Sequence, residues 1–323
     1  MRTRITDLLG IEYPIIQGAM ARIADASLAA AVSETGGLGI IACGGAKLDW
    51  IRQQVERARS LTSKPIGANV MLMDPQAEEV AKLLAELKIE VITTGAGSPG
   101  DYLPLWKEAG IKVIPVVATT SLARRMERLG VDAVVAEGTE SGGHVGELTT
   151  MALVPSVCEA VSIPVLAAGG IADGRGMCAA FALGAEGVQM GTRFLTVEEC
   201  TVCDPWKEKV LGAKDSDTIV TGRNTGHPVR GLKNKFAREC RKRELACSNP
   251  EDLEGMYAGS LSRAVAGDME GGSILAGQIA SLVTERGTAA DVIQQIMAEA
   301  EALGALDLQQ VADLNAQRGR CLA

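Results

Sequence analysis

The 323-residue chain is 47% apolar, contains three each of Trp, Tyr and Phe, and carries a formal net charge of −8. A chain of this length can bury a large core, and its acidic balance argues against general binding to nucleic acid or to anionic membranes. No apolar run is long enough to cross a bilayer and the first residues lack the apolar core of a signal peptide, so we expect a cytoplasmic protein.

Eight apolar runs rich in Val and Ile recur at nearly even spacing between residues 13 and 191. Their apolar character is continuous rather than alternating, which indicates parallel strands that are buried on both faces. The predicted strands are Tyr13–Gln17, Leu38–Ala42, Ile66–Met71, Glu90–Thr94, Lys112–Val117, Asp132–Glu137, Pro164–Ala168 and Gly187–Gly191.

Segments with helical periodicity lie between these strands. Several of them end in a glycine, as in Leu129-Gly130 and Leu183-Gly184, which is a common way to stop a helix. Strands that alternate with helices predict an α/β fold, here a (β/α)₈ TIM barrel closed by right-handed crossovers. The clearest predicted helices are Asp49–Leu61, Pro75–Lys88, Ser121–Leu129, Thr149–Val161 and Arg175–Leu183.

The pattern changes after Glu199, where short helical segments and polar loops replace the strand–helix alternation. We expect residues 200–272 to form a small α-helical lid, the substrate domain, inserted after the eighth strand. Residues 1–199 and 273–323 would then form the barrel. A helix beginning near Ser273 would return the chain to the barrel, and helices over Ala289–Ala302 and Asp307–Gln317 would complete it.

Eight cysteines are scattered through the chain without forming a small disulfide framework. Cys200-Thr-Val-Cys203 has the spacing of a metal or redox pair, but no second pair of this spacing accompanies it. With only two histidines and no acidic cluster, we expect free thiols in a reducing compartment and no metal site.

The segment Gly95-Ala-Gly-Ser-Pro-Gly100 matches the spacing of a dinucleotide-binding loop. A proline lies inside it, no acidic residue follows about 20 positions later to bind a ribose, and its place in the chain fits the barrel period. We therefore assign it to a barrel loop and not to a Rossmann site.

His144 lies on the glycine-rich segment Glu137–Gly146, directly after the sixth predicted strand. Active sites of α/β barrels lie on loops that follow the strands, and histidine exchanges protons near neutral pH. Glycines in such a loop let the backbone approach a flat or charged ligand. The alternative is a tight turn that happens to carry a histidine.

Two further glycine-rich loops follow the seventh and eighth strands. Barrels often bind phosphate there, because backbone amides, a hydroxyl and a helix N-terminus favour an anion. Two tight turns that need glycine for geometry alone are the alternative. The candidate phosphate ligands are Gly169, Gly170, Gln189, Gly191 and Thr192.

Asn69 places an amide at the end of an apolar strand, where its polar atoms need partners. A heteroaromatic ring with alternating donors and acceptors would supply them. The small residues Gly18 and Ala19, followed by Met20, leave room for such a ring after the first strand. Together with the phosphate loops, these residues suggest flavin mononucleotide (FMN) across the mouth of the barrel.

With these motifs the chain resembles a known family, the FMN-dependent enoyl-acyl-carrier-protein reductases of the FabK type, within the wider nitronate monooxygenase family of flavin barrels. The lid motif that contains His227 favours the reductase branch. The matching motifs are Tyr13–Gly18, Gly36–Ile41, Thr94–Gly97, Glu137–Gly146, Ala168–Gly174, Gly191–Phe194, Gly226–Arg230, Lys233–Lys235 and Ala276–Gln278.

The resemblance implies roles for the residues already singled out. Asn69, Glu137 and Gly142 match positions that contact the isoalloxazine ring and its ribityl chain, and the five candidate phosphate ligands match the phosphate end. His144 matches the catalytic histidine. Leu275 departs from the methionine of some relatives, which leaves the lining of the acyl pocket open.

The reaction that the resemblance implies is the reduction of trans-2-enoyl-acyl-carrier-protein to acyl-acyl-carrier-protein, the last step of fatty-acid elongation. NADH or NADPH would supply hydride through FMN. A nitronate monooxygenase and an NAD(P)H:quinone reductase are alternatives on the same barrel. A non-catalytic flavin or carrier-binding protein and a phosphosugar barrel without flavin also stay open, as do dependence on a monovalent cation and assembly into a homodimer.

A basic cluster stands out in the predicted lid. Acyl carrier protein is strongly acidic, so these side chains could steer it to the site. A solvated basic helix is the alternative. The cluster comprises Arg223, Arg230, Lys233, Lys235, Arg238, Arg241, Lys242 and Arg243, with Glu239 as the single acid between residues 223 and 243.

Overall fold

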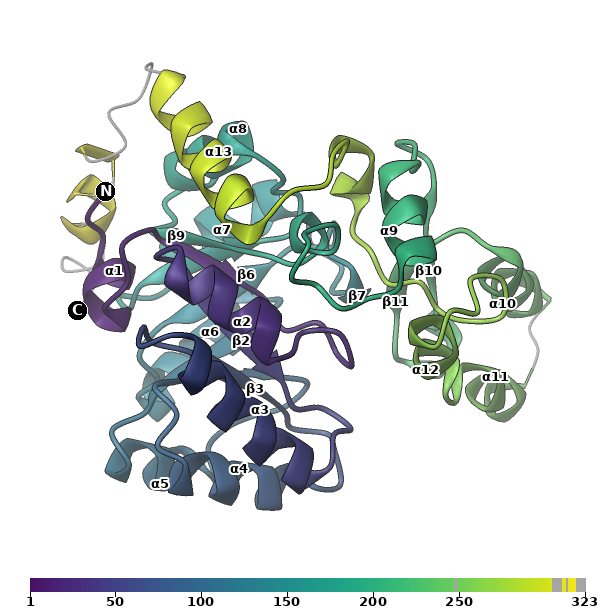
Figure 1. The fold of residues 1–323 in the computed structure, drawn as a ribbon, viewed down its shortest axis with the longest axis horizontal. Coiled ribbons are helices and arrows are strands. Elements are labelled where there is room, and N and C mark those ends of the chain that lie inside the picture. The colour runs from purple at the N-terminus through teal and green to yellow at the C-terminus, as the bar shows by residue number, and fades with distance from the viewer. Residues whose placement is uncertain (247–248, 304–309, 312, 318–323) are drawn as a thin grey trace.

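The computed structural model describes residues 1–246, 249–303, 310–311 and 313–317, and it contains a closed parallel barrel. The strands follow the order β1-β2-β3-β4-β5-β6-β8-β9, with β9 pairing back to β1. The predicted (β/α)₈ barrel is confirmed (Figure 1). The barrel strands are β1 (Ile15–Gln17), β2 (Leu38–Ala42), β3 (Gly67–Met71), β4 (Val91–Gly95), β5 (Lys112–Val117), β6 (Val134–Glu137), β8 (Val165–Ala168) and β9 (Gly187–Met190).

Helices surround the barrel, and three short ones were not among the predicted elements: α1, α2 and α5. Local capping explains two of them, because Thr3 forms a capping box before α1 and Asp25 accepts hydrogen bonds from the first amides of α2. The helices are α1 (Arg4–Leu9), α2 (Ala26–Glu34), α3 (Leu48–Leu61), α4 (Ala77–Glu86), α5 (Leu103–Glu108), α6 (Thr120–Leu129), α7 (Thr150–Cys158), α8 (Gly174–Ala182) and α13 (Ala289–Ala302).

The strands separate two aliphatic cores, since successive side chains of a strand point to opposite faces. One core fills the barrel interior, where Ile16, Ile40 and Leu166 are fully buried. Ile5 of α1 joins this core and closes the N-terminal end of the barrel. The other core lies between the strands and the surrounding helices. The opposite, C-terminal end is left for a site.

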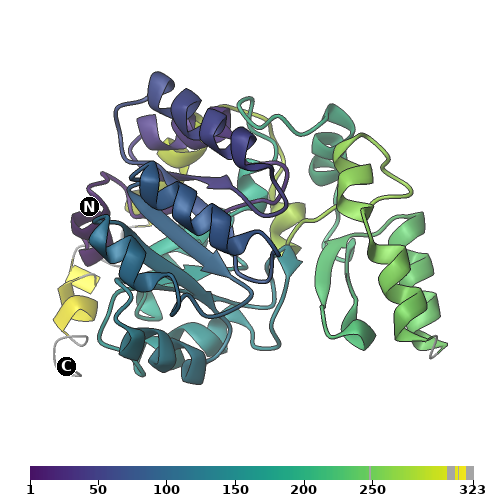
Figure 2. The same cartoon turned by 90° about the horizontal axis from the view of Figure 1, so that it is seen from below.

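The segment 200–272 lies to one side of the barrel (Figures 1 and 2). It is not purely helical as predicted, because β10 and β11 form an antiparallel hairpin inside it. We call residues 200–272 the lid segment. Its elements are α9 (Asp204–Leu211), β10 (Thr218–Thr221), the 3₁₀ turn η2 (Arg223–Thr225), β11 (Val229–Leu232), α10 (Lys235–Leu245), α11 (Pro250–Tyr257) and α12 (Ser260–Val265).

The return from the lid segment to the barrel differs from the prediction. No helix begins at Ser273; instead Leu232 N donates to Ile274 O at 2.8 Å and the chain runs extended beside β11. Pairing with β11 outweighs the local pattern, and a 3₁₀ helix follows only at Gln278–Leu282 (η3). In the predicted helix Asp307–Gln317, residues 310–311 and 313–317 are helical, and the others lie outside the described residues.

Within the described residues, no helix is both long and apolar enough to span a membrane.

Candidate functional site

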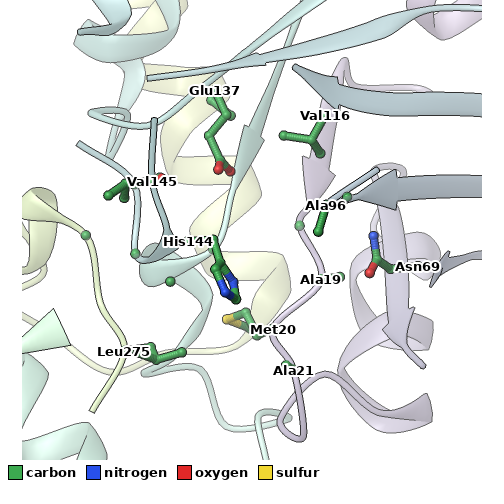
Figure 3. A pocket seen from close by; sticks show the side chains of 18 of the residues that line it. Ala19, Met20, Ala21, Asn69, Ala96, Val116, Glu137, His144, Val145 and Leu275 are labelled. Atoms are coloured by element: carbon green, nitrogen blue, oxygen red, sulfur yellow. The ribbon is translucent and has the colours of Figure 1, made fainter. Parts of the chain in front are cut away.

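All the predicted site residues line one cavity of about 1040 Å³ at the C-terminal end of the barrel. Loops that follow the strands form its walls. The lid segment and residues 273–282, which we call the return segment, supply the rest. Figure 3 shows the carboxylate of Glu137 and the imidazole of His144 on one side of the cavity, with Asn69 on the other. The sequence therefore predicted correctly which loops meet, while the role of each residue stays a proposal.

His144 belongs to a two-residue strand, β7 (Gly143–His144), which the sequence did not predict. This strand pairs with β11 of the lid segment, in the register His144 opposite Val229 and Gly143 opposite Arg230. The same ladder continues where Val145 N donates to Pro228 O at 3.1 Å. The predicted catalytic histidine is thus held by a sheet that the barrel and the lid segment build together.

The pKa of His144 lies below its ordinary value of 6.5. Partial burial of the imidazole between the cavity walls is the larger cause, and the charge that His227 carries when protonated is the smaller one. The neutral form of His144 is therefore favoured.

Glu137 ends β6 with its carboxyl group at the cavity, and burial raises the pKa of this group to about 7. The nearby hydroxyl of Ser141 opposes this effect and lowers the pKa of Glu137. The geometry of this hydroxyl is not that of a hydrogen bond to any described group. Near neutral pH Glu137 can thus either donate or accept a hydrogen bond toward a ligand.

Asn69 is the central residue of β3, not its last as expected, and it is oriented by its neighbour on β4. Its Nδ2 donates to Thr93 O at 3.2 Å and to Thr93 Oγ1 at 3.0 Å. Among the described residues, Asn69 Oδ1 has no protein donor, so this acceptor remains for a ligand. Thr93 therefore fixes the orientation of the Asn69 amide, and Asn69 Oδ1 is the atom that a ligand in the cavity could reach.

The loop after β1 passes close to Gln189 of β9. A Cβ atom at Gly18 would lie 3.0 Å from Gln189 Cγ and Cδ, so glycine is what lets the two strands approach here. Gln17 is fully buried and donates from Nε2 to Gly18 O. Ala19 and Met20 then continue along the cavity wall.

The predicted phosphate loops lie side by side after β8 and β9. Gly169 and Gly170 adopt φ values of 86° and 74°, which explains why glycine is needed there. Thr192 Oγ1 accepts a hydrogen bond from Gly277 N at 2.8 Å, which ties this loop to the return segment. The hydroxyl proton of Thr192 stays available for an anion.

Gly142 makes a contact that the sequence did not predict. A Cβ atom there would lie 2.6 Å from the carbonyl carbon of Ala276 and 2.7 Å from Gly277 N. Gly142 therefore lets the His144 loop pack against the return segment, in addition to lining the cavity.

These features fit FMN. The cavity joins a phosphate-compatible end, built from Gly169, Gly170 and Thr192, to an apolar wall that includes Met20 and Val116. The Ser141 hydroxyl is buried in the cavity lining without a partner, which is the kind of orphaned polar atom that a ligand would satisfy.

The cavity residues that carry no site assignment from the sequence include Arg22, Ser141 and His227. His227 carried a signal, because it is the second of only two histidines in the chain. Arg22 and Ser141 had none, because only the folded loops bring them to the cavity. Leu275, whose position the sequence left open, also lines it.

The described residues contain no group of three His, Cys, Asp or Glu side chains that could hold a metal ion. Cys200 is buried, and this burial raises the pKa of its thiol to about 11. The thiol is therefore neutral and unreactive at physiological pH.

Comparisons of the sequence place the chain among flavin barrels. A family model described as nitronate monooxygenase matches residues 2–87 and 76–299. A probable nitronate monooxygenase of Staphylococcus aureus is 35% identical over 284 residues, covering 74% of this chain and 80% of the relative. The (3aS,4S,5R,7aS)-5-hydroxy-7a-methyl-1-oxo-octahydro-1H-indene-4-carboxyl-CoA dehydrogenase of Mycobacterium tuberculosis is 38% identical over 239 residues, covering 73% of this chain and 67% of the relative.

Solved structures agree. FabK from Thermotoga maritima is 52% identical, with a TM-score of 0.92 over 94% of this chain and 97% of that chain. A nitroalkane oxidase from Streptomyces ansochromogenes is 30% identical, with a TM-score of 0.84 over 94% of this chain and 100% of that chain.

Proposed function

Because the chain belongs to the nitronate monooxygenase family of flavin-dependent oxidoreductases, we propose that it is an FMN-dependent reductase of trans-2-enoyl-acyl-carrier-protein that uses NAD(P)H. The observation that supports this choice within the family is the 52% identity to FabK from Thermotoga maritima, which extends through the lid segment because it covers 94% of this chain.

Asn69 and Glu137 would hold the ring of FMN, and the loops with Gly169, Gly170 and Thr192 would hold its phosphate. When bound, FMN would take hydride from NAD(P)H and deliver it to the β-carbon of the enoyl thioester. Glu137 can adapt its protonation to the ring, because burial raises the pKa of its carboxyl group to about 7.

His144 would act on the thioester. Reduction at the β-carbon moves negative charge onto the thioester oxygen, and the α-carbon must gain a proton. An imidazole N–H can hydrogen-bond that oxygen, and an imidazolium can give that proton. A His144→Ala variant that binds FMN should lose about 10²–10⁴-fold in kcat, the range usual for a general acid. Unchanged enoyl reduction by this variant would remove His144 from the mechanism.

Docking of the acidic carrier on the lid segment is part of the proposal. Several members of the basic cluster are engaged within the protein: Arg223 pairs with Glu147, Arg243 pairs with Glu239 at 2.9 Å, and Arg230 is buried. Exposed cations remain on α10, among them Lys235 and Lys242. These two side chains are the ones we expect a carrier to contact.

A second candidate function is oxidation of alkyl nitronates. Its support is the match to the nitronate monooxygenase model and the similarity to the probable nitronate monooxygenase of Staphylococcus aureus. Reduction of quinones by NAD(P)H would use the same cavity.

A substrate comparison tests the proposal. Purified protein loaded with FMN is assayed for NAD(P)H consumption with crotonyl thioester, with a quinone and without acceptor, and for oxygen uptake with an alkyl nitronate. We expect consumption that depends on the thioester. Turnover with the nitronate or the quinone alone would favour the alternative enzymes. Flavin binding without turnover would favour a binding protein, and failure to bind FMN would favour a phosphosugar barrel.

A further inference from the structure

The two histidines of the chain line the same cavity, one in β7 and the other two residues before β11. His144 is opposite Val229 in the β7–β11 ladder, and the hydrogen bond from Val145 N to Pro228 O extends this register by one residue. The next pair in this register is therefore Gly146 with His227. Side chains two positions apart on a strand share a face, so His144 and His227 are diagonal neighbours, within reach of long side chains.

Both side chains line the cavity. Within the described part of the chain, neither imidazole hydrogen-bonds to a protein group, so all four ring nitrogens remain for each other or for a ligand. Figure 3 shows His144 across the cavity from Asn69, and His227 lines the same cavity.

The turn that presents His227 is built from the lid side. Gly222 and Gly226 adopt φ values of 84° and 77°, and His227 N donates to Gly222 O at 3.1 Å. The buried carboxylate of Glu244 accepts from Gly222 N and from the Tyr257 hydroxyl, the latter at 2.9 Å. These contacts constrain the backbone and leave the imidazole of His227 without a structural task.

Other charged groups surround the pair, and most are engaged. On the lid segment Arg223 pairs with Glu147 of the barrel loop, and the buried Arg230 donates to Thr139 O at 3.0 Å. The charged side chains that line the cavity together with the pair are Arg22, Asp74, Glu137 and Glu140, and the Glu140 carboxylate accepts a hydrogen bond from Thr150 N.

We propose that His227 is a second acid–base residue of this cavity, which shares a single proton with His144 and serves the same reduction. This inference rests on the proposed function for its substrate. The lowered pKa of His144, to which the charge of His227 contributes, agrees with a pair that does not hold two protons at once.

One shared proton meets both needs of the reduction. When the β-carbon receives hydride, the electron pair of the double bond moves to the α-carbon and the thioester oxygen. The neutral histidine donates an N–H hydrogen bond to that oxygen, and the imidazolium gives its proton to the α-carbon. The new C–H bond takes the electron pair, both histidines are then neutral, and solvent returns one proton to the pair.

An NMR titration tests the shared proton without relying on turnover. The untagged protein has only two histidines, so its imidazole ¹H–¹³C spectrum contains two residues to follow with pH. We expect the pKa of His144 to rise in His227→Gln. In the reverse experiment, His144→Gln should change the imidazole resonances of His227, because coupling between two sites is reciprocal. Lys64→Gln, which removes an exposed charge from the barrel, should leave the titration of His144 unchanged.

Steady-state kinetics of the FMN-loaded protein give the second readout. We expect His227→Gln to lower kcat with crotonyl thioester by about 100-fold, the lower end of the range for general acids, with unchanged FMN content and melting temperature. Lys64→Gln should retain wild-type kcat with this substrate.

The two readouts must agree. Uncoupled titration of the two histidines, or an unchanged kcat in His227→Gln, would each overturn the proposal; a lower kcat without coupling would make His227 a positioning residue only. If wild-type protein shows no thioester-dependent turnover, the proposed function fails, while the titration still decides whether the two histidines share a proton.

Discussion

The interior of the barrel and the interior of the lid segment are stabilised by different kinds of contact. Fully buried aliphatic side chains such as Ile16, Ile40 and Leu166 fill the barrel. The lid segment depends on buried polar groups: Asn234 is 2% exposed and donates to Met269 O and Gly272 O at 2.8 Å each, and the Glu244 carboxylate anchors a turn. The cavity lies where the two meet. The barrel therefore supplies a rigid frame, and the lid segment supplies groups whose positions depend on specific contacts.

The largest effect should follow from opening a cavity in the barrel. Leu166→Ala should reduce the free energy of unfolding by about 4 kcal/mol, because Leu166 is fully buried and its removal leaves a void. The matched change Leu253→Ala, in the core of the lid segment, should lower turnover and leave the thermal unfolding of the barrel less affected. Circular dichroism melting curves and FMN retention measure both. Equal losses of barrel stability would show that the two parts unfold as one unit.

The second-largest effect should follow from a change where the His144 loop contacts the return segment. Gly142→Ala should cost about 3 kcal/mol, because its Cβ would lie 2.6 Å from the Ala276 backbone. Gly95→Ala is the control, since Gly95 also lines the cavity but its Cβ would meet nothing within 4 Å. Urea denaturation compares the two variants. A Gly142→Ala protein as stable as Gly95→Ala would contradict the tight contact between the His144 loop and the return segment.

Much of the barrel could be predicted from sequence, because its strands are continuous apolar runs and its helices repeat between them. The residues that line the cavity could also be predicted, because the loops that follow the strands of a parallel barrel all lie at one end of it. The strand β7 could not be predicted. Its two residues, Gly143 and His144, become a strand only through pairing with Val229 and Arg230, far along the chain. The helix expected at Ser273 does not form for the same reason, since that segment pairs with β11 instead.

A smaller effect should depend on pH. The folded-state pKa of Glu137 is raised to about 7 from 4.5, so between these values the folded protein binds more protons than the unfolded chain. The free energy of unfolding must therefore fall as pH rises through this window. Glu137→Gln cannot titrate, and we expect it to gain about 2.5 kcal/mol at pH 8 relative to pH 5, compared with wild type.

Denaturation curves at the two pH values measure this difference. Glu108→Gln, at an exposed position on α5, is the control that should follow wild type. If Glu137→Gln keeps the wild-type dependence on pH, burial does not raise the pKa of Glu137 as described.

The smallest effect concerns the lid surface. Lys242→Glu should weaken productive association with acyl carrier protein by about threefold at low ionic strength, and less as salt screens the charge. Lys64→Glu makes the same charge change on the barrel, outside the lid segment, and should have little effect. The measurement is kcat/KM with a carrier-bound substrate at several salt concentrations. Equal effects of the two variants would argue against docking on α10.

The central claim is that one cavity reduces an enoyl thioester through a bound flavin. An anaerobic titration of FMN-loaded protein tests it most directly: the flavin band is followed while NAD(P)H and then crotonyl thioester are added in turn. We predict that NAD(P)H bleaches the band and that the thioester restores it. A band that bleaches but recovers only with oxygen or a quinone, or one that NAD(P)H leaves unchanged, would contradict the account.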